Sequence, residues 1–241
     1  MPERPGRPRE GARQLAFDLP LDPRFGREDF FVSPSNEAAY TLVERWPDWP
    51  DTVLRLEGPP GSGKSHLASI WATRAHAWTV DAFEVVGGRV PHLVSGGALV
   101  VEDADAPGRD EAALFHLLNL ARERGVPVLV TASRPVEAWG LRIPDLLSRL
   151  RLSPLARLEA ADEPLLRAVL VKLFMDRQLI VDTGVIETLV TRMERSLRAA
   201  AEAVALLDRE ALSRGRRITR ALAAQVLGAA EAPDLAGEEP E

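Results

Sequence analysis

Apolar residues fall into short runs along the first two thirds of the chain, and each run ends at polar or glycine-rich positions. Short apolar runs with such boundaries predict buried strands. The expected strands cover residues 53–56, 77–80, 98–101, 126–131 and 156–159. Strands that are buried on both faces are typical of a parallel sheet, because helices then cover each side of it.

Between these runs, apolar residues recur at a spacing of three and four positions, which predicts helices. We expect helices at residues 37–45, 67–72, 110–124 and 144–149. Asp110 is suited to cap the third of them, and Gly125 is suited to end it. Because strands and helices alternate, the predicted fold class is α/β, with a parallel sheet of about five strands covered by helices.

From residue 162 onward the pattern predicts helices alone. They are expected at residues 165–177, 185–193, 197–212 and 219–227. This change divides the chain into an α/β domain at 23–161 and a small all-α lid domain at 162–228. The flanking segments at 1–22 and 229–241 are rich in proline, glycine or charge and are predicted to be disordered.

The loop after the first expected strand reads Gly58-Pro-Pro-Gly-Ser-Gly-Lys-Ser65 and matches the pattern G-x-x-x-x-G-K-[ST] at every fixed position. Its glycines let the backbone wrap closely around a phosphate, and the N–H groups that open the next helix can bind the anion. Lys64 would supply positive charge to the β- and γ-phosphates, and the Ser65 hydroxyl would hold Mg²⁺. The less specific alternative is an ordinary glycine-rich turn.

The residues of this stretch that we predict to contact a nucleotide are Gly58, Pro59, Gly61, Ser62, Gly63, Lys64, Ser65 and His66. A neighbouring strand must deliver carboxylates to the metal and to the attacking water. Glu102 and Asp103 follow the apolar run at 98–101, so they are the candidate carboxylates for the metal and the water. Thr131 and Ser133 close the next strand, where a polar side chain could sense the γ-phosphate. The alternatives are a helix-start signal for the acids and a capping role for the two hydroxyls.

Composition narrows the class of protein further. The chain has 241 residues, of which 46% are apolar and 27% charged, as in ordinary globular proteins. No stretch approaches the roughly 20 apolar residues that span a bilayer, and no signal peptide is recognisable, so we expect a cytoplasmic protein without a membrane partner. The absence of cysteine, the four scattered histidines and the net charge of −6 disfavour a zinc site and nucleic acid as the main ligand.

A short apolar patch, Gln14-Leu-Ala-Phe-Asp-Leu19, follows an N-terminal stretch rich in arginine, proline and glycine. Such an isolated patch on a flexible tail fits a peptide that docks in a hydrophobic pocket of a partner. The alternative is that the patch packs on its own domain. The pattern by itself does not distinguish docking on a partner from packing on the chain's own domain.

Several of these motifs, taken in their order, resemble the AAA+ ATPase family of the replication initiator DnaA and its regulator Hda. The resemblance covers roughly residues 25–227. The matching pieces are Phe30-Phe-Val-x-x-Ser-Asn36, Gly63-Lys-Ser-His-Leu67, Val100-Val-Glu-Asp103, Thr131-Ala-Ser-Arg-Pro135, Leu147-Ser-Arg149 and Leu197-Arg-Ala-Ala200.

The resemblance implies roles for residues that the pattern alone leaves unassigned. Gln14, Leu15, Phe17 and Leu19 look like the Hda-type peptide that binds the β sliding clamp on DNA. Arg149 matches the arginine finger, which acts in trans on the nucleotide of a neighbouring subunit. Arg198 matches the lid arginine that touches the protein's own nucleotide. The implied cofactors are ADP or ATP with Mg²⁺.

The chain departs from DnaA in three respects. The DNA-binding helix-turn-helix domain is missing, so direct sequence-specific DNA binding is not expected, and the segment between Val80 and Ala98 is too short for DnaA's inserted helices. Glu102 replaces the usual magnesium-binding aspartate, so the resemblance implies Glu102 as the metal ligand. No glutamate follows in the catalytic position, which leaves Asp103 as the candidate catalytic residue. We therefore expect weak or absent intrinsic ATPase activity.

Taken together, the resemblance implies a negative regulator of replication initiation that is tethered to the clamp and stimulates ATP hydrolysis by DnaA. The alternatives are an AAA+ loader ATPase of the helicase or transposase type and, less favoured, a stand-alone P-loop kinase for a small molecule. The sequence leaves open whether ADP or ATP is the working ligand and whether the chain forms a homo-oligomer.

Overall fold

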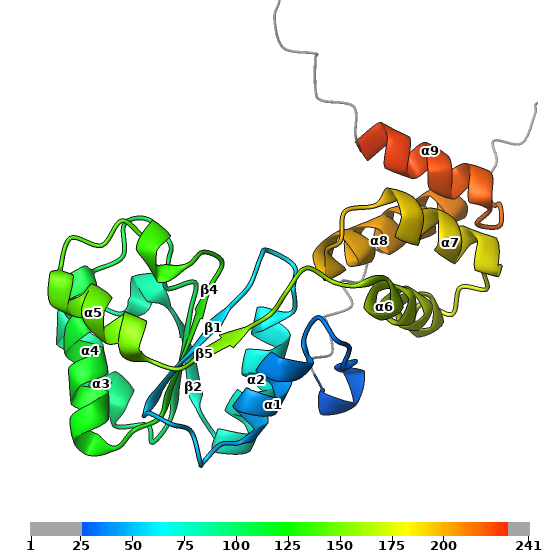
Figure 1. The fold of residues 1–241 in the computed structure, drawn as a ribbon. Helices are drawn as coiled ribbons and strands as arrows, with labels where there is room; N and C mark the ends of the chain where they lie inside the picture. The colour runs from blue at the N-terminus through cyan, green and yellow to red at the C-terminus, as the bar shows by residue number, and fades with distance from the viewer. Residues whose placement is uncertain (1–25, 231–241) are drawn as a thin grey trace, which may run out of the picture.

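In the computed structural model, which describes residues 26–230, five parallel strands form one sheet (Figure 1). Their order is β2-β3-β4-β1-β5, with β1 between β4 and β5. The strands are β1 (Val53–Glu57), β2 (Trp78–Asp81), β3 (Leu99–Glu102), β4 (Val128–Ala132) and β5 (Leu155–Arg157). The predicted α/β class with a five-stranded parallel sheet is confirmed, and the strand ends shift by two residues at most.

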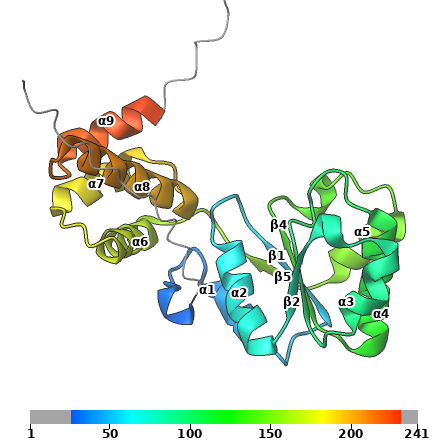
Figure 2. The same ribbon diagram turned by 180° about the vertical axis from the view of Figure 1, so that it is seen from behind.

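Helices cover both faces of this sheet, as Figures 1 and 2 show from opposite sides. The helices of the α/β part are α1 (Glu37–Glu44), α2 (Lys64–Ala75), α3 (Val90–Val94), α4 (Glu111–Arg124) and α5 (Pro144–Leu152). Helices α1 and α2 pack on one face, and α3, α4 and α5 pack on the other. Asp110 caps α4 by accepting a hydrogen bond from the Ala113 N–H at 2.9 Å, and Gly125 ends it, as predicted.

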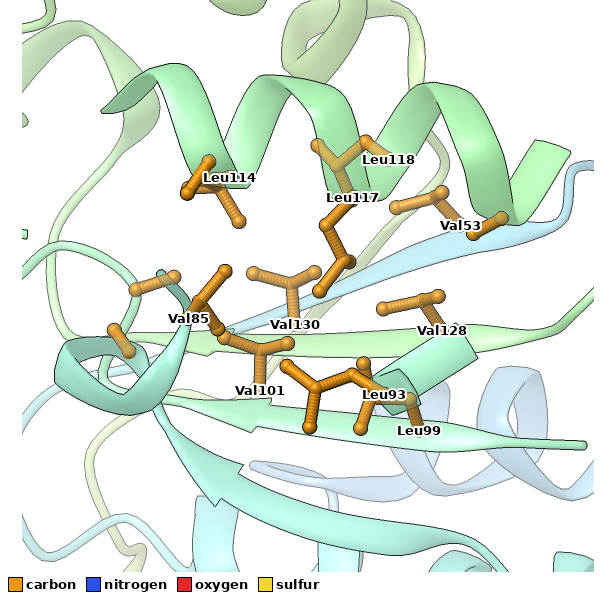
Figure 3. Close-up of a cluster of buried hydrophobic side chains, with 14 of the residues drawn as sticks. Val53, Val85, Leu93, Leu99, Val101, Leu114, Leu117, Leu118, Val128 and Val130 are labelled. Atoms are coloured by element: carbon orange, nitrogen blue, oxygen red, sulfur yellow. The ribbon is translucent and has the colours of Figure 1, made fainter. Parts of the chain in front are cut away.

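Alternation along the strands sends side chains into two separate cores. On the α4 side, leucines from α4 point at valines from β1, β3 and β4 (Figure 3). On the α2 side, Leu54, Leu56 and Leu129 pack against Trp71. Because both faces are buried in this way, the sheet needs the nearly continuous apolar strands that the sequence pattern displays.

The last four helices enclose a core of their own. They are α6 (Glu163–Asp176), α7 (Thr183–Arg192), α8 (Leu197–Arg214) and α9 (Arg220–Ala230). Asp162, Asp182 and Ser196 cap the first three, each accepting a hydrogen bond from a backbone N–H three residues later. Leu166, Phe174, Leu189, Val204 and Leu207 are among the side chains buried between them. We call this unit the helical part.

Several polar contacts among the described residues join the helical part to the α/β part. The Leu197 N–H donates to the Gly61 carbonyl at 2.8 Å. The Ser35 N–H donates to Asp162 Oδ2 at 3.1 Å, and Lys172 Nζ lies 3.1 Å from Asp29 Oδ1. The first of these contacts sets the beginning of α8 directly against the predicted phosphate-binding loop.

The parallel register brings the predicted site residues to one edge of the sheet. Leu56 lies opposite Thr131, and Val101 lies opposite Val130, so β1, β3 and β4 end side by side. The loops after these strands therefore meet at the carboxyl edge, where α/β proteins bind ligands. Within residues 26–230, no helix combines the length and the apolar character needed to cross a membrane.

Candidate functional site

The loop from Gly58 to Gly63, which we call the P-loop, connects the central strand β1 to helix α2. Gly61 and Gly63 have φ of +71° and +98°, a region that residues with a Cβ rarely adopt. Gly63 is the N-cap of α2, so the chain turns directly from the loop into the helix at Lys64. The first N–H groups of a helix have no acceptor within it, so this turn exposes donors to an anion.

Two glycines of the P-loop are also required by close packing. A Cβ at Gly58 would lie 2.7 Å from the Leu158 carbonyl oxygen and equally close to Ser62 Oγ. A Cβ at Gly61 would collide with Ser196 Oγ, at the N-terminus of α8. The loop is thus held between the end of β5 and the helical part.

Lys64 lies at the centre of this arrangement and is only 7% exposed. Its Nζ donates to the carbonyl oxygens of Gly58 at 2.8 Å and Pro59 at 3.1 Å. Burial lowers the pKa of Lys64, and the negative charges of Asp103, Asp105 and Glu102 oppose that shift. Three carboxylates therefore act on this ammonium group, as expected of residues that share one site.

The remaining residues of this stretch that were predicted to contact a nucleotide differ in their surroundings. Ser62 is buried, and its Oγ has no hydrogen-bond partner among the described residues. Pro59 and Ser65 are exposed. His66 Nε2 lies 2.9 Å from the Gly26 carbonyl oxygen, and its ring meets Phe30 edge-on at 5.3 Å. Through these contacts His66 joins α2 to the segment before α1.

A hydrogen-bonded cluster closes the carboxyl ends of β3 and β4. Thr131 Oγ1 donates to Glu102 Oε2 at 2.5 Å and accepts from the Asp103 N–H at 3.0 Å. Burial raises the pKa of Glu102, and the hydrogen bond from Thr131 opposes this shift. Asp103 is exposed and has a left-handed backbone with φ of +51°. The predicted metal ligand Glu102 is therefore hydrogen-bonded by Thr131, while Asp103, predicted to be catalytic, is exposed.

Asp105 is a site neighbour that sequence reasoning missed. It is buried, accepts a hydrogen bond from the Ser133 N–H at 3.1 Å, and pairs with Arg134 Nε at 3.0 Å. It thereby fixes the loop that carries Ser133 beside the loop that carries Asp103. The sequence contained one signal for Asp105, because it is the third acidic residue in the stretch Glu102-Asp-Ala-Asp105.

Arg198 lies near the P-loop through its backbone, but its side chain points elsewhere. A Cβ at Gly61 would lie 3.0 Å from the Cβ of Arg198. The guanidinium is 76% exposed and pairs with Glu202 across one helical turn, with Nε 2.8 Å from Oε1. In this arrangement the P-loop is touched by Ser196 and Leu197, two residues that the sequence did not single out for this role.

Arg149 is not brought into this cluster. It is exposed on α5, which packs on the face of the sheet opposite α2 (Figure 2). Its guanidinium carbon lies 5.5 Å from the centre of the Phe115 ring on α4. Gln14, Leu15, Phe17 and Leu19 lie outside the described residues.

The side chains near the P-loop suit a nucleotide that brings its own metal ion better than they suit a metal ion by itself. Within residues 26–230, no group of three or more His, Cys, Asp or Glu side chains is arranged to hold a metal ion. Mg²⁺ is usually held by one or two protein groups together with phosphate oxygens. Ser65, Glu102 and Asp103 suit that mode. The buried hydroxyl of Ser62 and the glycine turn beside it suit the phosphates.

Gly61→Ala is expected to release the helical part from the P-loop. The added methyl group meets Ser196 and requires an unfavourable φ, so the hydrogen bond from Leu197 to Gly61 should weaken. We expect faster amide hydrogen exchange at Leu197. Gly97→Ala is the matched control, because Gly97 has φ of +85° and nothing within 4 Å of an added Cβ. Equal exchange at Leu197 in both variants would contradict this account of the contact.

Comparison with known proteins supports the fold described above. No family model matches the sequence. Domain III of the replication initiation protein DnaA from Thermotoga maritima superposes with a TM-score of 0.72 at 19% identity, covering 88% of this chain and 98% of that one. AMPPCP-bound DnaA from Aquifex aeolicus gives a TM-score of 0.67 at 19% identity, covering 81% of this chain and 68% of that one.

A second group of similar structures is represented by RuvB, the Holliday junction branch migration motor of Thermotoga maritima. It gives a TM-score of 0.62 at 16% identity and covers 80% of this chain and 65% of that one. Together these likenesses show that the chain shares its fold with DnaA domain III and with RuvB.

Proposed function

We propose that this chain binds an adenine nucleotide, ADP or ATP, in the P-loop. The observation that carries the proposal is the burial of Lys64 in the loop, where its Nζ contacts the Gly58 and Pro59 carbonyls beside two left-handed glycines. Lys64 and the first N–H groups of α2 would bind the phosphates. Arg198 would turn from Glu202 toward the nucleotide, which needs only a change of side-chain rotamer at an exposed position.

Mg²⁺ would be held by Ser65 together with Asp103 or Glu102, and when bound it neutralises charge on the phosphate oxygens. The chain would act as two domains, at residues 23–161 and 162–228. The bound nucleotide would set the orientation of one domain relative to the other. Thr131 and Asp105 keep the loops that carry Asp103 and Ser133 in place for this purpose.

The biological role we propose is that of an Hda-like negative regulator of replication initiation in the cytoplasm. Two features that support it are the ordered motifs that resemble those of DnaA and Hda, and the DnaA-like fold. The third is Glu102, whose carboxylate already accepts a hydrogen bond from Thr131. A protein of this kind would hold its own nucleotide and act on the ATP of DnaA. Arg149 is exposed away from the chain's own P-loop, so it is available to another protein.

A loader or motor ATPase is the second candidate, and the fold likeness to RuvB favours it. The two functions differ in which protein turns over ATP. We expect the purified chain to hydrolyse ATP slowly and to accelerate ATP hydrolysis by DnaA when clamp-loaded DNA is present. Fast turnover by the chain alone would favour the motor, and turnover that needs a small-molecule acceptor would favour a kinase.

Replacing Gln14 and Leu15 together by alanine is expected to abolish binding to the sliding clamp. Peptide docking of this kind depends on a few anchor side chains, each worth about 2 kcal/mol or more. Clamp pull-down and nucleotide titration on the same samples separate the two activities, and nucleotide affinity should be unchanged. Arg7→Ala with Arg9→Ala is the control and should bind the clamp normally. Loss of both activities in the Gln14 and Leu15 variant would contradict the clamp assignment.

A further inference from the structure

An apolar groove of about 730 Å³ runs along the outer face of α6 and is not used by the proposed nucleotide site. It is lined by Phe31, Pro164, Arg167, Ala168, Val171, Lys172, Met175 and Asp176. Met175 is 70% exposed, and Val171 beside it is also exposed. Apolar side chains gathered in a surface groove favour an occupant that covers them.

The charged residues in the groove are all paired within the chain. Lys172 lies 2.5 Å from Asp176 and 3.1 Å from Asp29, and Arg167 pairs with Glu187 on α7. These pairs leave little charge to select a charged ligand. The groove therefore fits an occupant that offers apolar side chains.

The start of the described chain lies at the rim of this groove. Asp29 binds Lys172, and Phe31 is itself part of the lining. Residues 14–19 are joined to this rim by a short tether, because Leu19 precedes Gly26 by only seven residues. Seven residues reach at most about 25 Å when fully extended, whereas the groove from Pro164 to Met175 is about 16 Å long at 1.5 Å per helical residue.

We propose that the α6 groove binds the chain's own segment Gln14–Leu19. Leu15, Phe17 and Leu19 occupy alternate positions, so an extended segment would present all three on one face and cover about 13 Å of the groove. Gln14, Ala16 and Asp18 would then face solvent. A short tether raises the local concentration of the segment to the millimolar range, so weak intrinsic affinity suffices. While docked, the segment is withheld from any partner.

This inference goes beyond the proposed function, and its test needs neither nucleotide nor clamp. The chain has no cysteine, so two introduced thiols report on one contact alone. In the full chain, Leu19→Cys with Met175→Cys should form an intramolecular disulfide under mild oxidation. Its rate should be at least about tenfold faster than that of Leu19→Cys with Leu152→Cys, since docking raises the effective concentration of the thiols. Leu152 is 83% exposed on α5 and does not line the groove.

A second pair of variants tests the groove itself. Val171→Asp in the first double-cysteine chain should bring its rate down to that of the Leu152 pair. Ile180→Asp should leave it unchanged, because Ile180 is 95% exposed and does not line the groove. Equal rates for the two cysteine pairs, or disulfides formed between molecules at a rate that rises with protein concentration, would overturn the proposal. The second outcome would assign the groove to another copy of the chain.

Discussion

Arg149→Ala is expected to reduce the stimulation of DnaA ATP hydrolysis by about 10³-fold or more, which is the lower end of the effect of an arginine finger. A guanidinium stays charged and can form two hydrogen bonds to phosphate oxygens, so no neighbouring side chain replaces it. The measurement is phosphate release by DnaA in the presence of the chain and clamp-loaded DNA.

The variant should remain folded and retain its other activities. Arg149 is exposed, and its contact with the Phe115 ring is of a kind worth about 0.5–1 kcal/mol at exposed sites. Nucleotide affinity and clamp binding should therefore be unchanged. Arg151→Ala is the matched control on the same helix, because Arg151 is also exposed and pairs only with Glu137 among the described side chains. Unchanged stimulation by the Arg149 variant would refute the finger assignment.

Lys64→Ala is expected to weaken the binding of ADP and ATP by about 100-fold, or about 2.7 kcal/mol, the loss of charge-assisted hydrogen bonds to phosphate. The negative charges of Glu102, Asp103 and Asp105 act on Lys64, so its removal also leaves these carboxylates to repel the phosphates. Isothermal titration calorimetry with each nucleotide in the presence of Mg²⁺ measures the change.

Lys172→Ala is the control for this substitution, since Lys172 is the only other lysine of the chain and lies on α6. It should leave nucleotide affinity unchanged while losing its ion pairs with Asp29 and Asp176. If wild-type protein bound no adenine nucleotide, the proposed function would fail. The α6 groove would still be open to its own test.

The fold was predictable because its signals are local. Each strand buried on both faces needs a run of apolar residues, and each α/β crossover needs a helix with one apolar face. Asp110 and Gly125 mark the ends of α4 through hydrogen bonds to the nearest turn and a left-handed backbone. Such constraints act within a few residues, so they are visible without any knowledge of tertiary contacts.

The P-loop was predictable for the same reason, but its surroundings were not. A loop that binds phosphate needs glycine and lysine at fixed spacing, and the chain carries that pattern from Gly58 to Ser65. The predicted helix at 144–149 extends to Leu152, and the segment 81–97 contains two 3₁₀ turns in addition to α3. Helix ends depend on capping and packing contacts that the pattern only partly records.

The rest of the site depends on hydrogen bonds between side chains that follow different strands. Glu102 was expected to hold a metal, yet Thr131, 29 positions away, donates a hydrogen bond to it. Asp105 connects the loops after β3 and β4 through Ser133 and Arg134. These pairs form because parallel strands bring their carboxyl ends together, and a linear sequence does not state which strands are neighbours.

The sequence by itself determined the α/β class, the alternation that buries the sheet on both faces, and the chemistry of the P-loop, since each depends on residue types at short spacing. Only the tertiary structure decided that Ser196 and Leu197 rest on Gly61 and that α6 carries an apolar groove. The physical reason is distance along the chain: these contacts join segments separated by more than 100 residues or depend on how whole helices pack.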